Sequence, residues 1–153
     1  MGNNIKKNRA LCDEILSAGH LIGNHTFNHS KLRGLDNNTA AAEIDSFNHL
    51  LLDEHGCKVK YFRPPHGQFT LSTKNMLAKR GMKNIMWSLL THDYKNDLNL
   101  VKFAVENYIK NNSIIVLHDS IKSKDIIIDS INLIVETSSR KGYEIGDPAE
   151  CLK

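Results

Sequence analysis

The feature that most constrains this chain is its regular alternation of helical and strand-like segments, with little sequence between them. Apolar spacing and end signals predict five helices, over residues 5–18, 38 or 39–55, 72–81, 97–109 and 124–140. Short apolar runs predict strands between the helices, over residues 20–23, 59–62, 84–90, 113–117 and 143–145. This order predicts an α/β fold in which right-handed helical crossovers join parallel strands.

The length limits the architecture. A chain of 153 residues can bury a substantial core, and without a linker or repeat it predicts one domain over residues 1–153. A complete eightfold barrel usually takes about 250 residues. The chain also opens on a helix, although folds of this type usually open on a strand. We therefore expect an open sheet or part of a barrel.

Composition excludes several classes of protein. A net charge of +3 with scattered lysines does not supply the clustered positive surface that nucleic-acid binding requires. No apolar run reaches the length of a membrane span, and the first twenty residues lack the hydrophobic stretch of a signal peptide. Cys12, Cys57 and Cys151 are isolated in the sequence, so we expect free thiols that are buried or partly buried.

Residue types that can act in catalysis or ligand binding follow four of the predicted strands. Ligands and catalytic groups of α/β folds gather at the carboxyl ends of the strands. The segments found there are His25-Thr26-Phe27-Asn28-His29, Arg63-Pro64-Pro65-His66-Gly67, His92-Asp93-Tyr94 and His118-Asp119. The convergence of histidines, an arginine and carboxylates on one rim predicts an active site.

Two of these segments indicate a reaction type. On a helical turn, the spacing of His25 and His29 would place both imidazoles on one face, where they could bind one metal ion. An isolated pair at this spacing is more often a pair of surface histidines, and no glutamate follows His25 as zinc peptidases require. His118 directly follows a buried strand, which suits proton transfer near neutral pH.

Taken together, the segments resemble the polysaccharide deacetylase family (carbohydrate esterase family 4), which includes chitin and peptidoglycan deacetylases. Residues 18–29 (AGHLIGNHTFNH) resemble its GHxIGNHTxxH metal motif, and residues 62–67 (FRPPHG) resemble its RxPxG motif. Residues 115–119 (IVLHD) and 141–144 (KGYE) resemble its LHD and KGYxF motifs. The motifs occur in the order of the family and span nearly the whole chain.

The resemblance implies a distorted, incomplete (β/α) barrel that holds a divalent metal, commonly zinc. His25 and His29 would bind the metal together with an aspartate. The implied activity is the metal-dependent hydrolysis of N-acetyl groups on a polysaccharide or oligosaccharide of N-acetylated amino sugars.

The resemblance also assigns roles to residues in the other motifs. His118 would protonate the leaving amine while Asp93 tunes its charge. Arg63 would orient a catalytic carboxylate, and the backbone N–H of His66 would stabilise the oxyanion. The implied substrate contacts are Pro65, Tyr94, Val116 and Leu117.

The sequence departs from the family pattern at several positions. Nothing before the metal motif resembles the TFDD segment, which supplies two aspartates on the first strand of the family. We therefore expect an N-terminally truncated domain that lacks its first strands and has an incomplete metal site. Asp36 or Asp119 could substitute as a ligand, although no motif places them. Tyr94 stands where the family has tryptophan, Val116 where leucine is common, and His66 where tyrosine is frequent.

Three hypotheses remain. The first is an N-acetyl hydrolase whose activity is impaired in this chain by the loss of the aspartates. The second is a catalytically inactive carbohydrate- or metal-binding module on the same scaffold. The third is a homo-oligomer in which a strand of another subunit pairs with an open sheet edge. The sequence leaves the cellular compartment open, although family members are often exported or associated with the cell envelope.

Overall fold

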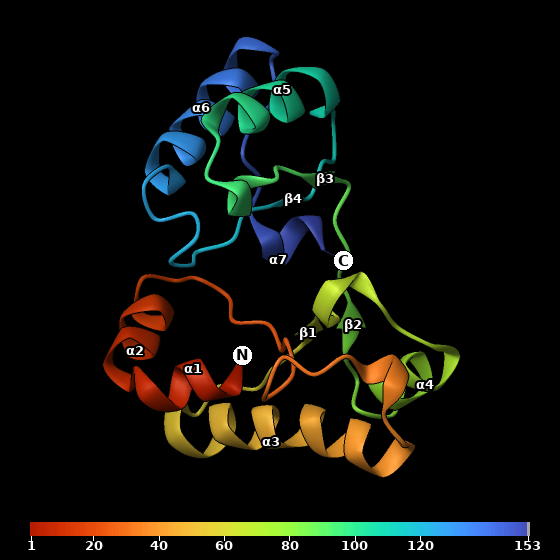
Figure 1. Cartoon of the computed structure of the whole chain (residues 1–153). Coiled ribbons are helices and arrows are strands. Elements are labelled where there is room, and N and C mark those ends of the chain that lie inside the picture. The colour runs from red at the N-terminus through yellow and green to blue at the C-terminus, as the bar shows by residue number, and fades with distance from the viewer. Residues whose placement is uncertain (153) are drawn as a thin grey trace. The chain divides into compact units, whose positions relative to one another are not determined.

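The computed structural model describes residues 1–152 and divides into two compact units, Met1–Met86 and Trp87–Lys153. Each unit contains a pair of short parallel strands joined through a helix (Figure 1). The α/β class is therefore observed in both units. The (β/α) barrel and the single domain over residues 1–153 stay predictions.

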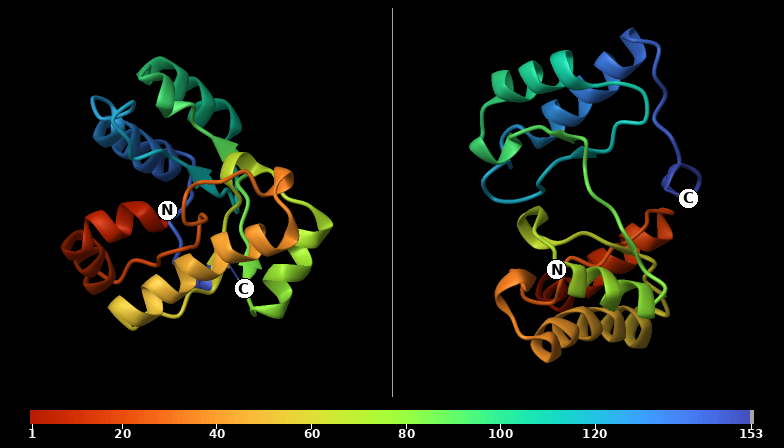
Figure 2. Two further views of the ribbon diagram at one scale, coloured as in Figure 1. Left: turned by 60° about the horizontal axis from the view of Figure 1, so that its bottom comes forward. Right: turned by 90° about the vertical axis from the view of Figure 1, so that its right-hand side faces the viewer.

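The first unit is built around α3. Its elements are α1 (Gly2–Lys7), α2 (Arg9–Ser17), the 3-10 turn η1 (Leu32–Gly34), α3 (Asn37–His55), β1 (Tyr61–Phe62), the 3-10 turn η2 (Pro65–Gly67), α4 (Leu71–Lys79) and β2 (Lys83–Asn84). α3 contacts both α1 and α4, as the two views of Figure 2 show. β1 lies between β2 and the segment at Asn24, because Phe62 pairs in parallel with both Asn84 and Asn24.

The second unit contains the other strand pair. Its elements are β3 (Leu89–Leu90), the 3-10 turn η3 (Asp93–Lys95), α5 (Leu98–Tyr108), β4 (Ile115–Val116), α6 (Ile127–Arg140) and α7 (Pro148–Cys151). β3 pairs in parallel with β4, so that Leu89 lies opposite Ile115 and Leu90 opposite Val116. α5 packs against both α6 and β3.

The predicted helices are present, but several begin or break elsewhere. The first is interrupted at Asn8, whose φ of −134° and ψ of 55° are not helical. α3 is capped by Asp36, whose carboxylate accepts from the backbone N–H groups of Asn38 and Thr39. α4 is capped by Thr70, which accepts from Thr73 N–H. α5 is capped by Asp97, the first residue of its predicted range, which accepts from Asn99 N–H.

The strands differ more from prediction than the helices do. The run over residues 84–90 contains the end of β2 and all of β3, with residues 85–88 outside both strands. Residues 20–23 form no strand, and the neighbouring Asn24 forms only an isolated bridge. Residues 143–145 are not a strand within the described chain. An apolar run indicates burial. A strand also needs a neighbouring strand for its backbone hydrogen bonds, and the apolar run does not show whether one is present.

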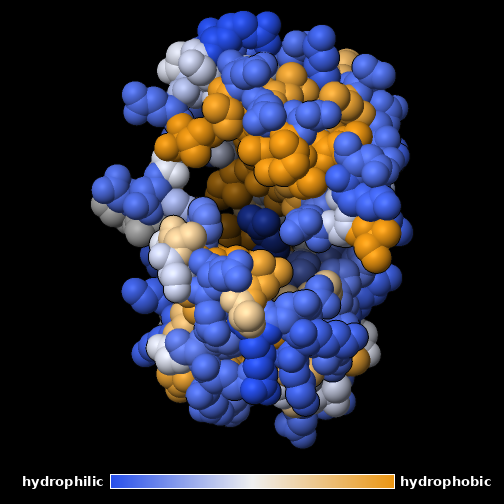
Figure 3. Space-filling view, turned by 90° about the vertical axis from the view of Figure 1, so that its left-hand side faces the viewer, coloured by the Kyte–Doolittle hydropathy of each residue, from blue (hydrophilic) through white to orange (hydrophobic). Residues whose placement is uncertain are grey.

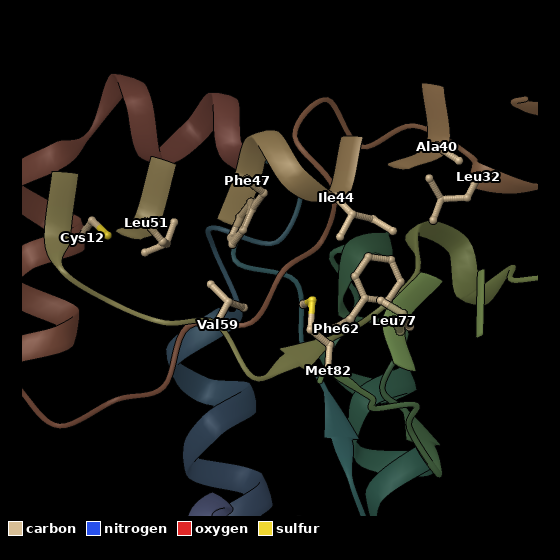
Figure 4. Packing of buried hydrophobic residues seen from close by; sticks show 10 residues of the cluster. All are labelled: Cys12, Leu32, Ala40, Ile44, Phe47, Leu51, Val59, Phe62, Leu77 and Met82. Atoms are coloured by element: carbon tan, nitrogen blue, oxygen red, sulfur yellow. The ribbon is translucent and has the colours of Figure 1, made fainter. Parts of the chain in front are cut away.

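The core of the first unit depends on one face of α3. Ile44, Phe47 and Leu51, which recur at helical spacing, are completely buried. They pack with side chains from other elements of the unit, namely Cys12, Leu32, Ala40, Val59, Phe62, Leu77 and Met82 (Figure 4). The second unit has its own core of Leu89, Val101, Ala104, Val105, Ile109 and Ile134.

Some apolar side chains remain exposed on the second unit. On α6, Ile128, Ile131 and Val135 lie at helical spacing and are exposed. Figure 3 shows hydrophobic side chains gathered over the part of the molecule that holds α5 and α6 in Figure 1. None of the helices described is long and apolar enough to cross a membrane. The thiols are free, with Cys12 buried, Cys57 partly buried and Cys151 exposed, so the expected burial of Cys151 is wrong.

Two adjacent leucines on α3 test the core assignment. Leu51 is fully buried and Leu52 is 51% exposed. We expect Leu51→Ala to lower the free energy of unfolding by about 2–5 kcal/mol, because it removes buried methyl groups and leaves a cavity. The matched control Leu52→Ala should change it by no more than about 0.5 kcal/mol. Urea denaturation measures both, and equal effects would contradict the assignment.

Candidate active site

A buried amide organises the loop that carries His25. The Asn24 side chain is fully buried, and its amide nitrogen donates to the Ile44 carbonyl and to Asn48, both at 2.9 Å. Its oxygen accepts from the backbone N–H of Thr26 at 2.8 Å. Its backbone also bonds on both sides to the β1 segment, through Tyr61 and Arg63. The loop therefore starts from a fixed point between α3 and β1.

His25 and His29 come together without a helix, so the predicted helical turn is wrong. Residues 25–29 form an irregular loop in which Thr26 and His29 have left-handed φ values of 61° and 62°. The two imidazole centroids are nevertheless 4.9 Å apart. The two rings are neighbours, as the spacing in the sequence predicted. The loop conformation, and not helical periodicity, brings them together.

The environment of His25 leaves one ring nitrogen available. Its Nδ1 lies 2.6 Å from the Arg63 carbonyl oxygen, which can only accept, so Nδ1 carries the hydrogen and Nε2 keeps its lone pair. Burial lowers the pKa of His25 from 6.5 to about 4. A neutral imidazole whose tautomer is fixed by a backbone carbonyl is the form in which histidine binds metal ions.

The RPPHG segment supplies the other groups of the first unit. Arg63 Nε donates to the Ile85 carbonyl at 3.0 Å, and burial lowers the pKa of its guanidinium. Pro65 is buried, and His66 is exposed with a left-handed φ of 55°. The His66 ring centroid lies 5.0 Å from that of His29. The first unit therefore gathers His25, His29, Arg63 and His66.

A buried carboxylate fixes His118 in the second unit. Asp93 is completely buried and accepts from the backbone N–H of His118 at 2.6 Å and from its Nδ1 at 2.9 Å. Thr91 Oγ1 also donates to Asp93, at 2.9 Å, and lies 2.8 Å from the Val116 carbonyl. Nδ1 of His118 therefore carries a hydrogen, which it donates to Asp93. Nε2 of the half-exposed His118 is the ring nitrogen that this bond does not engage.

The remaining predicted residues are placed as follows. The Tyr94 ring lies 5.1 Å from the His118 ring at an interplanar angle of 86°. Val116 is buried in β4, and Leu117 packs against the second core. Asp119 is exposed. The Asp36 carboxylate accepts from Thr39 Oγ1 as well as from the backbone N–H groups of Asn38 and Thr39, so it serves as the cap of α3.

The described residues match only part of a catalytic metal site. Within residues 1–152, no group of three or more His, Cys, Asp or Glu side chains is placed to hold a metal ion. His25 and His29 fit two ligand positions, since their rings are adjacent and His25 is neutral with Nε2 available. Catalytic zinc typically has three protein ligands. The described part of the chain thus offers a two-imidazole portion of such a site.

Sequence reasoning missed the groups that orient the site. Asn24 and Thr91 are fully buried polar residues, and each bonds to residues of the loop that follows it. The left-handed conformations at Thr26, His29, His66 and His92 were also missed. Such backbone strain costs about 1–3 kcal/mol per residue and concentrates at functional sites. None of these positions is a glycine, so the sequence carries no clear signal of their positive φ values.

The ionisation of His25 provides a direct test of its environment. Its folded-state pKa of about 4 lies below the ordinary 6.5. Between these values the unfolded chain binds a proton that the folded chain does not, so the free energy of unfolding falls as pH drops from about 6.5 to about 4. We expect NMR titration to show the His25 ring protonating near pH 4, and His25→Gln to flatten this pH dependence of stability. A His25 pKa near 6.5 would contradict the burial argument.

Comparison with known proteins places this geometry in a family. The model of the family described as "Polysaccharide deacetylase" matches residues 1–85. The protein YlxY of Bacillus subtilis is 28% identical over 152 residues, which are 99% of this chain and 46% of that protein. The chitooligosaccharide deacetylase of Azorhizobium caulinodans is 34% identical over 106 residues, or 66% of this chain and 49% of that protein.

A solved structure shares the fold. A family 4 carbohydrate esterase pseudoenzyme from Bacillus anthracis superposes with a TM-score of 0.86 at 23% identity, covering 99% of this chain and 53% of that one. The chain spans about half the length of the curated relatives it matches, 46% and 54% for the first two. The family model covers more than half of the residues and agrees with the motifs quoted above. The chain belongs to the polysaccharide deacetylase family.

Proposed function

We propose that the chain supplies groups for the metal-dependent hydrolysis of N-acetyl groups on a polysaccharide of N-acetylated amino sugars. Family membership supports the reaction class, and several relatives are named as chitin or peptidoglycan deacetylases. The observation that carries the proposal is the bond from His118 Nδ1 to the buried Asp93 carboxylate. This bond orients the imidazole through Nδ1 and leaves Nε2 as the nitrogen that could transfer a proton. The carboxylate at Nδ1 can stabilise an imidazolium.

Proton transfer explains why the reaction would need His118. When an acetamide is hydrolysed, water adds to the carbonyl carbon, and the C–N bond breaks with the electron pair leaving on nitrogen. The amine leaves readily only if that nitrogen receives a proton, which the Nε2–H of a protonated His118 can donate. Asp93, held in turn by Thr91, would keep the ring oriented and offset its positive charge.

In this proposal, residues of the first unit activate the acetamide carbonyl of the substrate. His25 and His29 would hold a divalent metal, proposed to be zinc, together with a ligand beyond these two imidazoles. When bound, such a metal polarises the carbonyl and lowers the pKa of water. The Arg63 carbonyl fixes the His25 tautomer, and the His66 backbone N–H is the proposed donor to the oxyanion. Arg63 is proposed to orient a catalytic carboxylate, and the proposed substrate contacts are Pro65, Tyr94, Val116 and Leu117.

The chain by itself is proposed to be impaired. Its described residues place two imidazoles but no third ligand for a metal ion. The same observation favours a second candidate, an inactive carbohydrate- or metal-binding module. The fold is compatible with it, because the Bacillus anthracis structure with the same fold is described as a pseudoenzyme. Acetate release and ligand binding distinguish the two candidates.

We expect little or no acetate release from chitin oligomers or peptidoglycan fragments by the 153-residue chain, with zinc or cobalt added. Any turnover that occurs should fall about 10²- to 10⁴-fold in His118→Gln, which removes the proton donor. The control His49→Gln changes an exposed histidine on α3 and should have no effect.

Calorimetry on the same samples completes this test. Saturable heat with zinc that disappears in His25→Ala supports the metal assignment. Saturable heat with N-acetylglucosamine oligomers and no turnover supports the binding module. Rapid turnover by the chain alone would refute the proposed impairment, and turnover that is indifferent to His118→Gln would refute the proposed role of His118.

A further inference from the structure

His92 has an unusual backbone conformation immediately before the buried Asp93. Its φ of 60° and ψ of 21° lie in the left-handed region, which residues with a Cβ adopt uncommonly because that atom crowds the backbone. Its carbonyl accepts from the backbone N–H of Lys95 at 3.0 Å, which starts η3. The motifs and the proposed reaction give His92 no role.

The His92 side chain contacts Tyr94. Nδ1 of His92 and the Tyr94 hydroxyl share a hydrogen bond of 3.0 Å, and their ring centroids are 5.8 Å apart. Side chains two residues apart on a regular helical turn do not face each other. The left-handed turn at His92 therefore accompanies a pairing that a continuous helix would not provide.

Tyr94 also contacts His118. The Tyr94 ring packs edge to face with the His118 ring, with centroids 5.1 Å apart. Tyr94 is 36% exposed, so burial alone does not fix its ring. Asp93 restrains His118 at Nδ1 and at the backbone, but one side-chain hydrogen bond leaves the plane of an imidazole able to rock about that bond. The Tyr94 ring supplies the second restraint.

We propose that His92 is a positioning residue, whose hydrogen bond to the Tyr94 hydroxyl holds the tyrosine ring against the imidazole of His118. The catalytic consequence rests on the proposed function, in which His118 transfers a proton. The positioning itself is a property of the folded chain and can be measured whether or not the chain is active. His92 would act through Tyr94 and would not touch the reacting atoms.

The test uses His92→Gly, Tyr94→Phe and the double variant. Glycine adopts a φ of 60° without strain, so His92→Gly keeps the turn and removes only the side chain. Tyr94→Phe keeps the ring and removes the hydroxyl. Asn96→Gly is the matched backbone control, because Asn96 has a left-handed φ of 55° at the other end of η3.

The primary readout is the NMR chemical shifts of the His118 ring protons, which respond to the position of the neighbouring aromatic ring. We expect His92→Gly and Tyr94→Phe to shift these signals in the same direction, the double variant to add nothing further, and Asn96→Gly to leave them unchanged. Unchanged His118 signals in His92→Gly would overturn the proposal. An additional shift when His92→Gly is introduced into Tyr94→Phe would also overturn it, because His92 would then act by another route.

A kinetic readout applies to any preparation that releases acetate. His92→Gly should lower kcat about two- to tenfold, the effect expected from one net hydrogen bond, while KM stays within about twofold. A rise in KM at constant kcat would assign His92 to substrate binding and overturn the positioning role. Absence of turnover counts against the activity of the chain, and the NMR result then decides the proposal.

Discussion

A polar group buried from water must find its hydrogen-bond partners inside the protein, and this requirement fixes the loops of both units. In the first unit the Asn24 side chain bonds to α3 and to its own loop, while its backbone bonds to the β1 segment. In the second unit the Asp93 carboxylate bonds to Thr91 and His118. Loss of either network would leave a buried group unsatisfied, which costs more than the bond itself contributes. Buried side chains thus hold the loops next to the short strands in both units.

These networks place two histidines in different environments. His25 donates Nδ1–H to a backbone carbonyl in a partly buried position, and burial favours its neutral form. His118 donates Nδ1–H to a buried carboxylate and is itself half-exposed. A carbonyl fixes a tautomer without adding a charge, whereas a carboxylate also stabilises a positive charge on the ring. One residue type therefore suits metal binding in the first unit and proton transfer in the second, as the proposed reaction requires.

The sequence predicted the helices better than the strands, for physical reasons visible in particular residues. The spacing of Ile44, Phe47 and Leu51 specifies a buried helix face by itself, and Asp97 caps α5 through a local bond. Residues 143–145 had the composition of a strand, but pairing depends on a distant neighbour that composition does not reveal.

The candidate site residues stay predictions, and the structure shows how each unit arranges its own. The positions after the predicted strands include His25 and Arg63, which are hydrogen-bonded in the first unit. They also include Asp93 and His118, which are hydrogen-bonded in the second unit. The left-handed residues were not foreseen, since histidine and threonine give no sign of positive φ. Nor could the sequence show that the His118 ring would pack edge to face against Tyr94, because the two residues lie far apart in the chain.

The central claim is that the adjacent imidazoles of His25 and His29 are two ligands of one divalent metal ion. NMR of the chain titrated with paramagnetic cobalt(II) tests it most directly, because a bound paramagnetic ion perturbs nearby nuclei according to their distance from it. The account predicts that the ring signals of His25 and His29 shift or broaden together, at the same cobalt concentration. His25→Ala should abolish the change at His29 as well. Unperturbed His29 signals in a chain whose His25 is saturated with cobalt would contradict the account.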